Sequence, residues 1–198
     1  MSPLGRLAAI SVDQYHAMIK AGILPEGAPI ELLDGLLVWK DRSDHGGGFM
    51  TIGPNHAICL MKIEDLQPDI RRLGAHLRSQ KPIQIPPSHE PEPDAMIVCG
   101  KPYDIIGRHP NPNEVSCVIE VSSSSLEHDR TGKLRVYAAA GIPQYIVVNL
   151  IDRRVEVFEG PSFEKSKYTT HKIIKPGKSV SFLAGKKRLS VPVSNLLP

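Results

Sequence analysis

Two apolar segments of this chain are predicted to be buried strands, and each of them carries a carboxylate. Asp94 precedes the apolar run 95–98, and Glu120 lies within the run 117–121. Strands with apolar residues on both faces are typical of the centre of a sheet. An ionised carboxylate is costly there unless a metal or another cation neutralises it. The pair therefore favours a metal site within a protein that has a central sheet.

The order of the predicted elements indicates an α/β fold. Strands are expected at about 94–99, 115–121 and 144–148, and a helix capped by Asp129 is expected at about 130–140. The sequence of strand, helix and strand resembles a βαβ crossover, which makes two strands parallel. Short antiparallel strands are expected to follow at 155–158, 168–174 and 179–183. We expect a mixed central β-sheet flanked by helices.

The N-terminal part predicts a helix followed by a β-hairpin. Residues 11–14 resemble a capping box and begin an apolar stripe that ends before Gly22. The runs 30–33 and 36–39 then flank Asp34-Gly35, a dipeptide that tolerates the backbone angles of a tight hairpin. A glycine-rich loop at 41–55 and a second helix, interrupted at Pro68 and finished near Gly74, are expected next.

Length and composition are those of an ordinary globular protein. The chain of 198 residues, 41% hydrophobic and 23% charged, is expected to form one domain over residues 1–198. No apolar run approaches the ~20 residues that a membrane span needs, so no membrane partner is expected. The N-terminus lacks a signal-peptide pattern, which makes a cytoplasmic location the default expectation. The three cysteines lack zinc-ligand spacing and are expected to be reduced.

The two carboxylates predict a site for a hard divalent cation. Alternation along the strand places Val118 and Glu120 on one face. If the strands that carry Asp94 and Glu120 are neighbours, both carboxylates can bind one cation, together with a backbone carbonyl, which we assign to Val121, and water. Mg²⁺ suits these ligands, with Mn²⁺ as the alternative. The alternatives are structural roles. Asp94 could cap a strand or turn, and Glu120 could pair with a buried Lys or Arg.

Lys133 is the candidate cation beside this metal. It lies near the start of the helix that follows the Glu120 strand, on a turn different from Leu134 and Ala138. A lysine there could orient the attacking water or help to deprotonate it, and could offset negative charge as a phosphodiester is attacked. The pattern favours metal-assisted phosphodiester hydrolysis, and a solvated helix residue is the alternative for Lys133.

In this order, these residues resemble a known superfamily of nucleases. Pro93-Asp94, Glu120-Val121-Ser122 and Lys133 resemble the PD-(D/E)XK pattern. The chain also resembles the Uma-type family of restriction endonucleases within that superfamily, through segments at 31–35, 55–56, 93–94, 119–122, 129–133 and 141–145. The resemblance implies a restriction-endonuclease-like core, with Asp94 and Glu120 as metal ligands and Lys133 as the catalytic lysine.

Two positions depart from the family pattern. Ser122 occupies the third place of the Glu-X-Lys element, so the lysine is displaced to Lys133 on the helix. Leu36 stands where a second acid usually follows Asp-Gly, which leaves Glu31 as the acidic residue of the hairpin that could assist catalysis. His56 is a candidate contact for water or substrate phosphate, with a structural role equally open, and Gln84 is a weaker candidate for substrate binding.

The leading hypothesis is a Mg²⁺-dependent endonuclease that acts on DNA. The family implies a homodimer, because cutting two strands needs two sites. Residues 160–198 contain eight Lys or Arg against one acid, Glu164, which suits a polyanion although a solvated basic surface explains it as well. The alternative function is a non-catalytic module of the same fold that binds nucleic acid or a protein.

Overall fold

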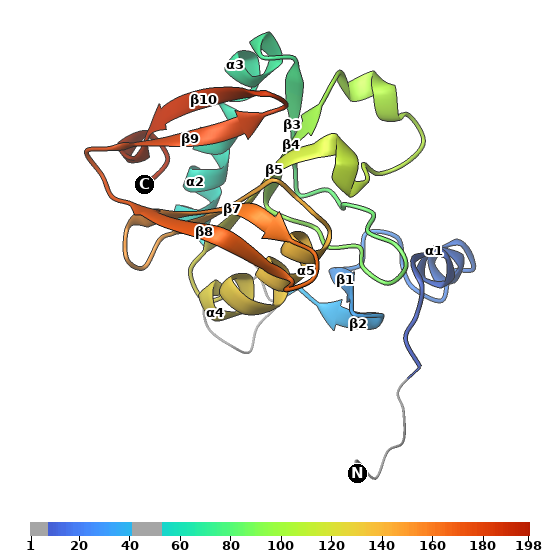
Figure 1. Cartoon of the computed structure of the whole chain (residues 1–198). Helices are drawn as coiled ribbons and strands as arrows, with labels where there is room; N and C mark the ends of the chain where they lie inside the picture. The colour runs from blue at the N-terminus through green and yellow to red at the C-terminus, as the bar shows by residue number, and fades with distance from the viewer. Residues whose placement is uncertain (1–7, 41–52) are drawn as a thin grey trace.

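The computed structural model describes residues 8–40 and 53–198, and its centre is a six-stranded sheet (Figure 1). The strand order is β3-β4-β5-β6-β7-β8. β5 and β6 run parallel and every other neighbouring pair is antiparallel, so the predicted mixed sheet is confirmed. The strands are Ala75–Ser79, Ala95–Cys99, Val115–Ser122, Gln144–Asn149, Arg154–Ser162 and Lys167–Ile174.

A continuous helical segment makes the crossover between the parallel strands β5 and β6. It consists of α4 (Leu126–His128), the π-helical turn η3 (Asp129–Lys133) and α5 (Leu134–Ala139). The sequence predicts a helix that starts near residue 130 with Asp129 as its cap, and this start is wrong. Asp129 lies inside the helical segment because its carboxylate accepts buried hydrogen bonds from side chains instead of capping the backbone.

The two faces of the sheet are covered by different elements. Val118 of β5 packs with Tyr137 of α5 on one face, whereas Ile119 packs with Ile63 of α2 and Phe182 of β9 on the other. This alternation follows from the period of two along a strand. The second face is covered by α2 (Pro54–Glu64), α3 (Gln67–Arg72) and the separate hairpin of β9 (Ser179–Ala184) and β10 (Lys187–Pro192).

The N-terminal helix and hairpin form as the sequence predicts. In α1 (Val12–Lys20), Ser11 and Gln14 make both hydrogen bonds of a capping box. β1 (Ile30–Leu33) and β2 (Leu36–Trp39) pair across Asp34 and Gly35, whose φ angles are 53° and 72°. Glycine adopts positive φ without steric cost, which explains its place in this tight turn. The hairpin brings Glu31 to the site described below.

Other boundaries differ from the expected ones. The second helix ends at Glu64 and a separate helix begins at Gln67, rather than one helix kinked at Pro68. Three short 3₁₀ helices complete the described elements: η1 (Pro102–Ile105), η2 (Pro112–Glu114) and η4 (Val193–Asn195). Of the expected glycine-rich loop, residues 41–52 lie outside the described residues.

Within residues 8–40 and 53–198, no helix combines the length and the apolar character that crossing a membrane requires. That residues 1–198 form one domain stays a prediction.

Candidate active site

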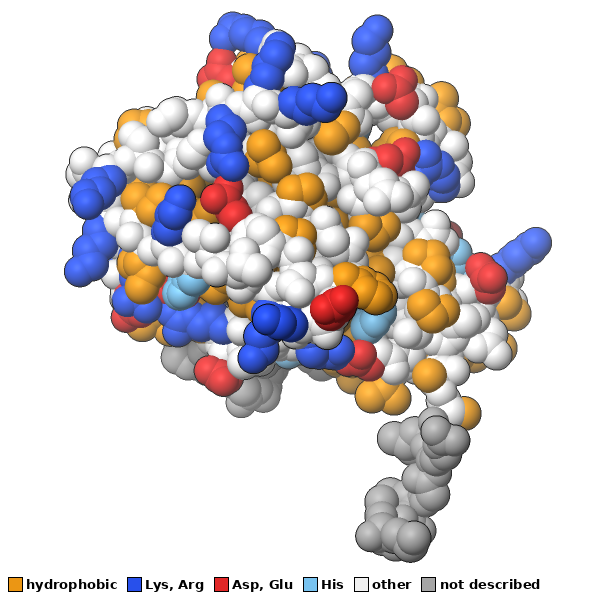
Figure 2. All heavy atoms as spheres, viewed as in Figure 1, with side chains coloured by type: hydrophobic (Ala, Val, Ile, Leu, Met, Phe, Trp, Pro, Cys, Tyr) orange, Lys and Arg blue, Asp and Glu red, His pale blue; other side chains and the backbone are white. Residues whose placement is uncertain are grey.

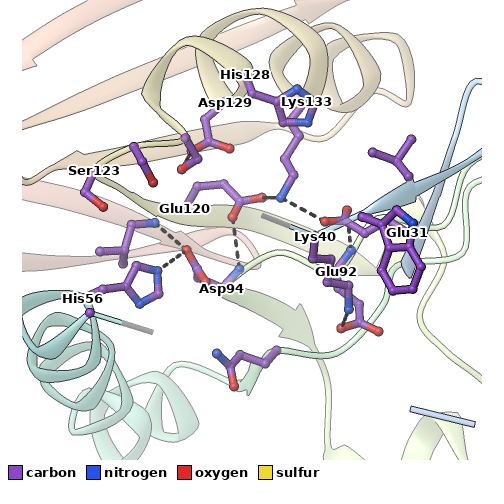
Figure 3. Close-up of a pocket in the computed structure, with 17 residues that line it drawn as sticks. Glu31, Lys40, His56, Glu92, Asp94, Glu120, Ser123, His128, Asp129 and Lys133 are labelled. Atoms are coloured by element: carbon purple, nitrogen blue, oxygen red, sulfur yellow. Dashed lines mark hydrogen bonds and ion pairs between the residues drawn. The ribbon is translucent and has the colours of Figure 1, made fainter. Parts of the chain in front are cut away.

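A cavity of about 300 Å³ lies where the pairing of β4 and β5 ends (Figure 3). The last paired residues toward this end are Ala95 and Ile119, and Asp94 and Glu120 lie one position beyond them. The end of a paired strand therefore delivers both carboxylates to the cavity. Its wall also contains charged or polar residues from the hairpin, α2 and the crossover segment, including Glu31, Lys40, His56, Asp129 and Lys133.

Asp94 and Glu120 are direct neighbours. The backbone N–H of Asp94 donates to Oε2 of Glu120 over 3.2 Å, and the backbone N–H of Val121 donates to Oδ2 of Asp94 over 2.8 Å. The N–H and C=O of one strand residue point to the same side, so the Val121 carbonyl also faces the side of Asp94. The three candidate metal ligands are thus brought together.

Two donors from the crossover segment converge on the other oxygen of Glu120. The Lys133 ammonium lies 3.0 Å from Oε1, and the Tyr137 hydroxyl donates to the same oxygen over 3.1 Å. Glu120 is only 2% exposed. Burial raises the pKa of Glu120 well above its ordinary value, and the charge of Lys133 opposes this rise only partly. A metal cation would add the positive charge that favours the ionised carboxylate.

Lys133 also approaches Glu31 of the hairpin, with 3.5 Å between Nζ and Oε1. The second oxygen of Glu31 accepts a hydrogen bond of 3.1 Å from the backbone N–H of Glu92. Burial by itself lowers the pKa of Lys133, but the carboxylates of Glu120 and Glu31 outweigh it and raise the pKa well above the ordinary value. In its protonated form Lys133 is suited to stabilising negative charge at the site.

His56, near the start of α2, contacts Asp94 directly. Its Nε2 atom lies 3.0 Å from Oδ2 of Asp94. Burial raises the pKa of Asp94, but hydrogen bonds from His56 and Val121 and nearby positive charge hold it below its usual value. His56 is expected from the sequence to contact water or substrate, and the structure places it where it orients a candidate metal ligand.

Gln84 is not brought to the cavity. Its backbone N–H donates to the carbonyl of Pro110 over 2.9 Å, and the described cavity wall contains Gln80 rather than Gln84. Gln80 lies at the cavity because its backbone N–H donates to the carbonyl of Asp94. Gln84 lies four positions further along the proline-rich connection.

The sequence predicts Asp129 as a helix cap and assigns no site role to Lys40 or Glu92, although all three line the cavity. The buried Asp129 carboxylate accepts hydrogen bonds of 2.7 Å from the hydroxyls of Ser122 and Ser125, and Lys40 forms an ion pair with Glu92. Ser122 thus holds Asp129 in place at the position where the family pattern has a lysine. Tyr137 could have been found, because it lies one helical turn beyond Lys133.

The candidate ligands of this site are a few oxygen atoms. They suit Mg²⁺ better than a metal whose ligands must all come from the protein. Within the described parts of the chain, no cluster of three or more His, Cys, Asp or Glu side chains is arranged to hold a metal. Mg²⁺ commonly uses one or two carboxylates and retains several waters. Asp94, Glu120 and the Val121 carbonyl are the oxygen groups that could hold such a metal.

Comparisons with known proteins identify relatives of this chain. A structure described as a "putative nuclease belonging to DUF820", from Anabaena variabilis ATCC 29413, is similar with a TM-score of 0.65 and 16% identity. The similarity covers 94% of this chain and 97% of that one, which shows a shared fold. No curated protein matches this sequence significantly. The family model Uma2, described as "Putative restriction endonuclease", matches residues 50–193. Since the match spans well over half of the sequence, this chain belongs to the Uma2 nuclease family.

Proposed function

We propose that this protein is a Mg²⁺-dependent endonuclease that hydrolyses phosphodiester bonds of DNA. One observation carries the proposal: the adjacent carboxylates of Asp94 and Glu120 meet the Lys133 ammonium, 3.0 Å from Glu120, at the wall of one cavity (Figure 3). Two carboxylates that can hold a divalent cation, with a lysine beside them, suit metal-assisted attack on a phosphodiester. Membership of the Uma2 family supports the same chemistry.

Each residue of the site has a distinct part in this proposal. Asp94, Glu120 and the Val121 carbonyl would hold Mg²⁺, or Mn²⁺ in its place. When bound, the metal polarises a phosphoryl oxygen and makes its water a better nucleophile. Lys133 stabilises the negative charge that develops on the phosphate and orients the water. Glu31 orients Lys133 from the opposite side, and His56 orients Asp94.

The surface charge of the protein supports a polyanionic substrate. All eight Lys and Arg side chains of residues 160–198 are exposed, and the same segment contains one acid, Glu164. Figure 2 shows Lys and Arg side chains distributed over the part of the molecule that β8, β9 and β10 form. Such a surface attracts the phosphate backbone without regard to base sequence.

The proposal is tested by nicking of supercoiled DNA in Mg²⁺ or Mn²⁺. We expect Asp94→Asn and Lys133→Met each to reduce the cleavage rate by about 100-fold or more, because each removes a charge at the transition state. Lys187→Met is the matched control, since Lys187 is an exposed lysine on β10 and should leave the rate nearly unchanged. Circular dichroism and urea unfolding establish that each variant is folded.

Absence of cleavage by the wild-type protein on supercoiled, linear and single-stranded DNA, over a range of salt concentrations, would contradict the proposal. DNA binding that is indifferent to both metals, with no heat of metal binding in calorimetry, would support the non-catalytic alternative. Cleavage that persists in both Asp94→Asn and Lys133→Met would place the active site elsewhere.

A further inference from the structure

Trp39 is the single tryptophan of the chain, and it lies at the cavity that contains Asp94 and Glu120. It is the last residue of β2 and pairs with Ile30 of β1. Although Ile30 is 7% exposed, Trp39 is 69% exposed. Among the described residues, the indole takes part in none of the aromatic ring contacts. A large flat apolar surface is therefore presented beside the acidic site.

This exposure is unusual for its position. Tryptophan gains more than most residues from burial of its ring, and a hairpin strand offers an inner position to such a side chain. Glu31 and Val38 form the neighbouring pair of the hairpin, and both contribute to the same cavity. The lining of the cavity thus includes a charged, an aliphatic and an aromatic residue of the hairpin. A ligand with both a charged and a flat apolar part would match this wall.

We propose that Trp39 stacks on an unpaired nucleobase of the substrate, next to the phosphodiester bond held by the site, so that unpaired DNA is preferred over fully paired duplex. The inference rests on the proposed nuclease function and specifies its substrate class. Nucleobase stacking on an aromatic ring is the common mode of binding to single strands, and it needs no particular base sequence.

The geometry of double-stranded DNA gives the reason for this preference. In a duplex, each base is covered on both faces by its neighbours, and only its edges are accessible in the grooves. A ring can therefore stack on a base only where the strand is single, mismatched or locally opened. The cavity of about 300 Å³ has the size of a small-molecule site, which suits one nucleotide rather than the width of a duplex.

Trp39 fluorescence provides a direct binding test, because no second tryptophan contributes. The wild-type protein is titrated, in chelator and at fixed salt, with a single-stranded oligonucleotide, a blunt duplex of the same sequence and a duplex with a central mismatched bubble. We expect quenching by the single strand and the bubble, and about tenfold weaker binding of the blunt duplex. Unchanged fluorescence at saturation with single-stranded DNA would overturn the inference.

Variants separate stacking from general attraction to phosphate. We expect Trp39→Ala to lose the preference for the single strand to within about twofold, as measured by anisotropy of labelled DNA, and Trp39→Phe to keep part of it. Phe163→Ala is the matched control, because Phe163 is a 79% exposed aromatic that is not part of the described cavity wall. Equal losses in Trp39→Ala and Phe163→Ala, or no loss in Trp39→Ala, would refute the stacking role.

The binding and cleavage experiments test the two proposals separately, so either proposal can be refuted without the other. Stacking on single-stranded DNA without any metal-dependent cleavage would refute the nuclease proposal and leave the nucleobase contact standing. Metal-dependent cleavage of duplex and single strand at equal rates, unaffected by Trp39→Ala, would refute the contact and leave the nuclease proposal standing.

Discussion

At the scale of single residues, the carboxylate of Glu120 shows how a buried charge is accommodated. Its two oxygens receive the backbone N–H of Asp94, the Lys133 ammonium and the Tyr137 hydroxyl. These partners come from the residue that precedes β4 and from the crossover segment. The tyrosine is the neutral member of the group, so it can be altered without changing the charge of the site.

Tyr137→Phe is expected to lower the free energy of unfolding by roughly 1 to 2 kcal/mol, because one buried hydrogen bond to Glu120 is lost. It should also reduce DNA nicking, since the orientation of Glu120 then depends on fewer contacts. Urea unfolding and the plasmid assay measure the two effects. Tyr15→Phe is the control, because the Tyr15 hydroxyl donates to the carbonyl of Ile30, away from Glu120.

We expect Tyr15→Phe to cost a similar free energy but to leave nicking unaltered. Equal nicking by the Tyr137→Phe and wild-type proteins would show that the hydroxyl serves stability alone.

At the scale of elements, an ion pair attaches the crossover segment to β7. The guanidinium of Arg130 in η3 binds both oxygens of Glu156, whose side chain is 1% exposed. Asn149 and Arg154 also donate to Glu156. Burial raises the pKa of Glu156, but these hydrogen bonds outweigh it and lower the pKa from 4.5 to about 2. The attached turn is the one that carries Asp129 and Lys133.

A lowered pKa means that Glu156 stabilises the fold above about pH 4.5, and that this contribution is lost as the pH falls toward 2. Glu156→Gln should therefore reduce the free energy of unfolding at neutral pH by about 3 kcal/mol, and the difference should shrink below pH 4.5. Urea unfolding across this pH range measures it. A difference that is constant with pH would contradict the assigned cause.

Glu114→Gln is the comparison for this variant. A hydrogen bond from Arg108 lowers the pKa of Glu114 to about 2, although burial opposes this shift. Unlike Glu156, however, the Glu114 side chain is 27% exposed. Because solvent screens ion pairs at the surface, we expect this substitution to cost about 1 kcal/mol or less. Comparing the losses of unfolding free energy in Glu156→Gln and Glu114→Gln shows how much burial adds to the effect of an ion pair.

The elements differ in how far the sequence could predict them. β4, β5 and β6 were predictable because their apolar runs need no partner to be recognised. β3 was missed, since His76 and Arg78 interrupt its apolar pattern and its strand structure depends on pairing with β4. The early start of the crossover helix was missed for a similar reason: it depends on the contacts of Asp129 with two serines that the fold brings together.

At the scale of the whole molecule, the structure brings four candidate residues to one cavity, whereas their contacts could not be predicted. Asp94, Glu120, Lys133 and Glu31 meet at one cavity, as their order in the family pattern implies. Their partners could not be read from spacing, because His56 reaches Asp94 from α2 and Glu31 reaches Lys133 from the hairpin. Such contacts join segments distant in the sequence, and only the folded topology specifies them.

Whether the protein acts as a homodimer is a prediction for the whole molecule. The resemblance to the family implies a homodimer, so we expect light scattering to give twice the chain mass of 21.7 kDa. A monomer at all concentrations would contradict this prediction and would indicate that each chain cuts one strand at a time. The measurement therefore also bears on how the substrate is cut.

The assembly of the site from distant segments has a consequence for biosynthesis. Glu31 belongs to an N-terminal hairpin, and Asp94 directly precedes the central strand β4. Glu120 lies in β5, and Lys133 lies in the helical segment that follows. A chain emerging from the ribosome presents the acids before the lysine, and none of them is oriented until the sheet and its crossover have formed. Until these contacts form, Asp94, Glu120 and Lys133 are not held together, so the proposed activity requires the complete fold.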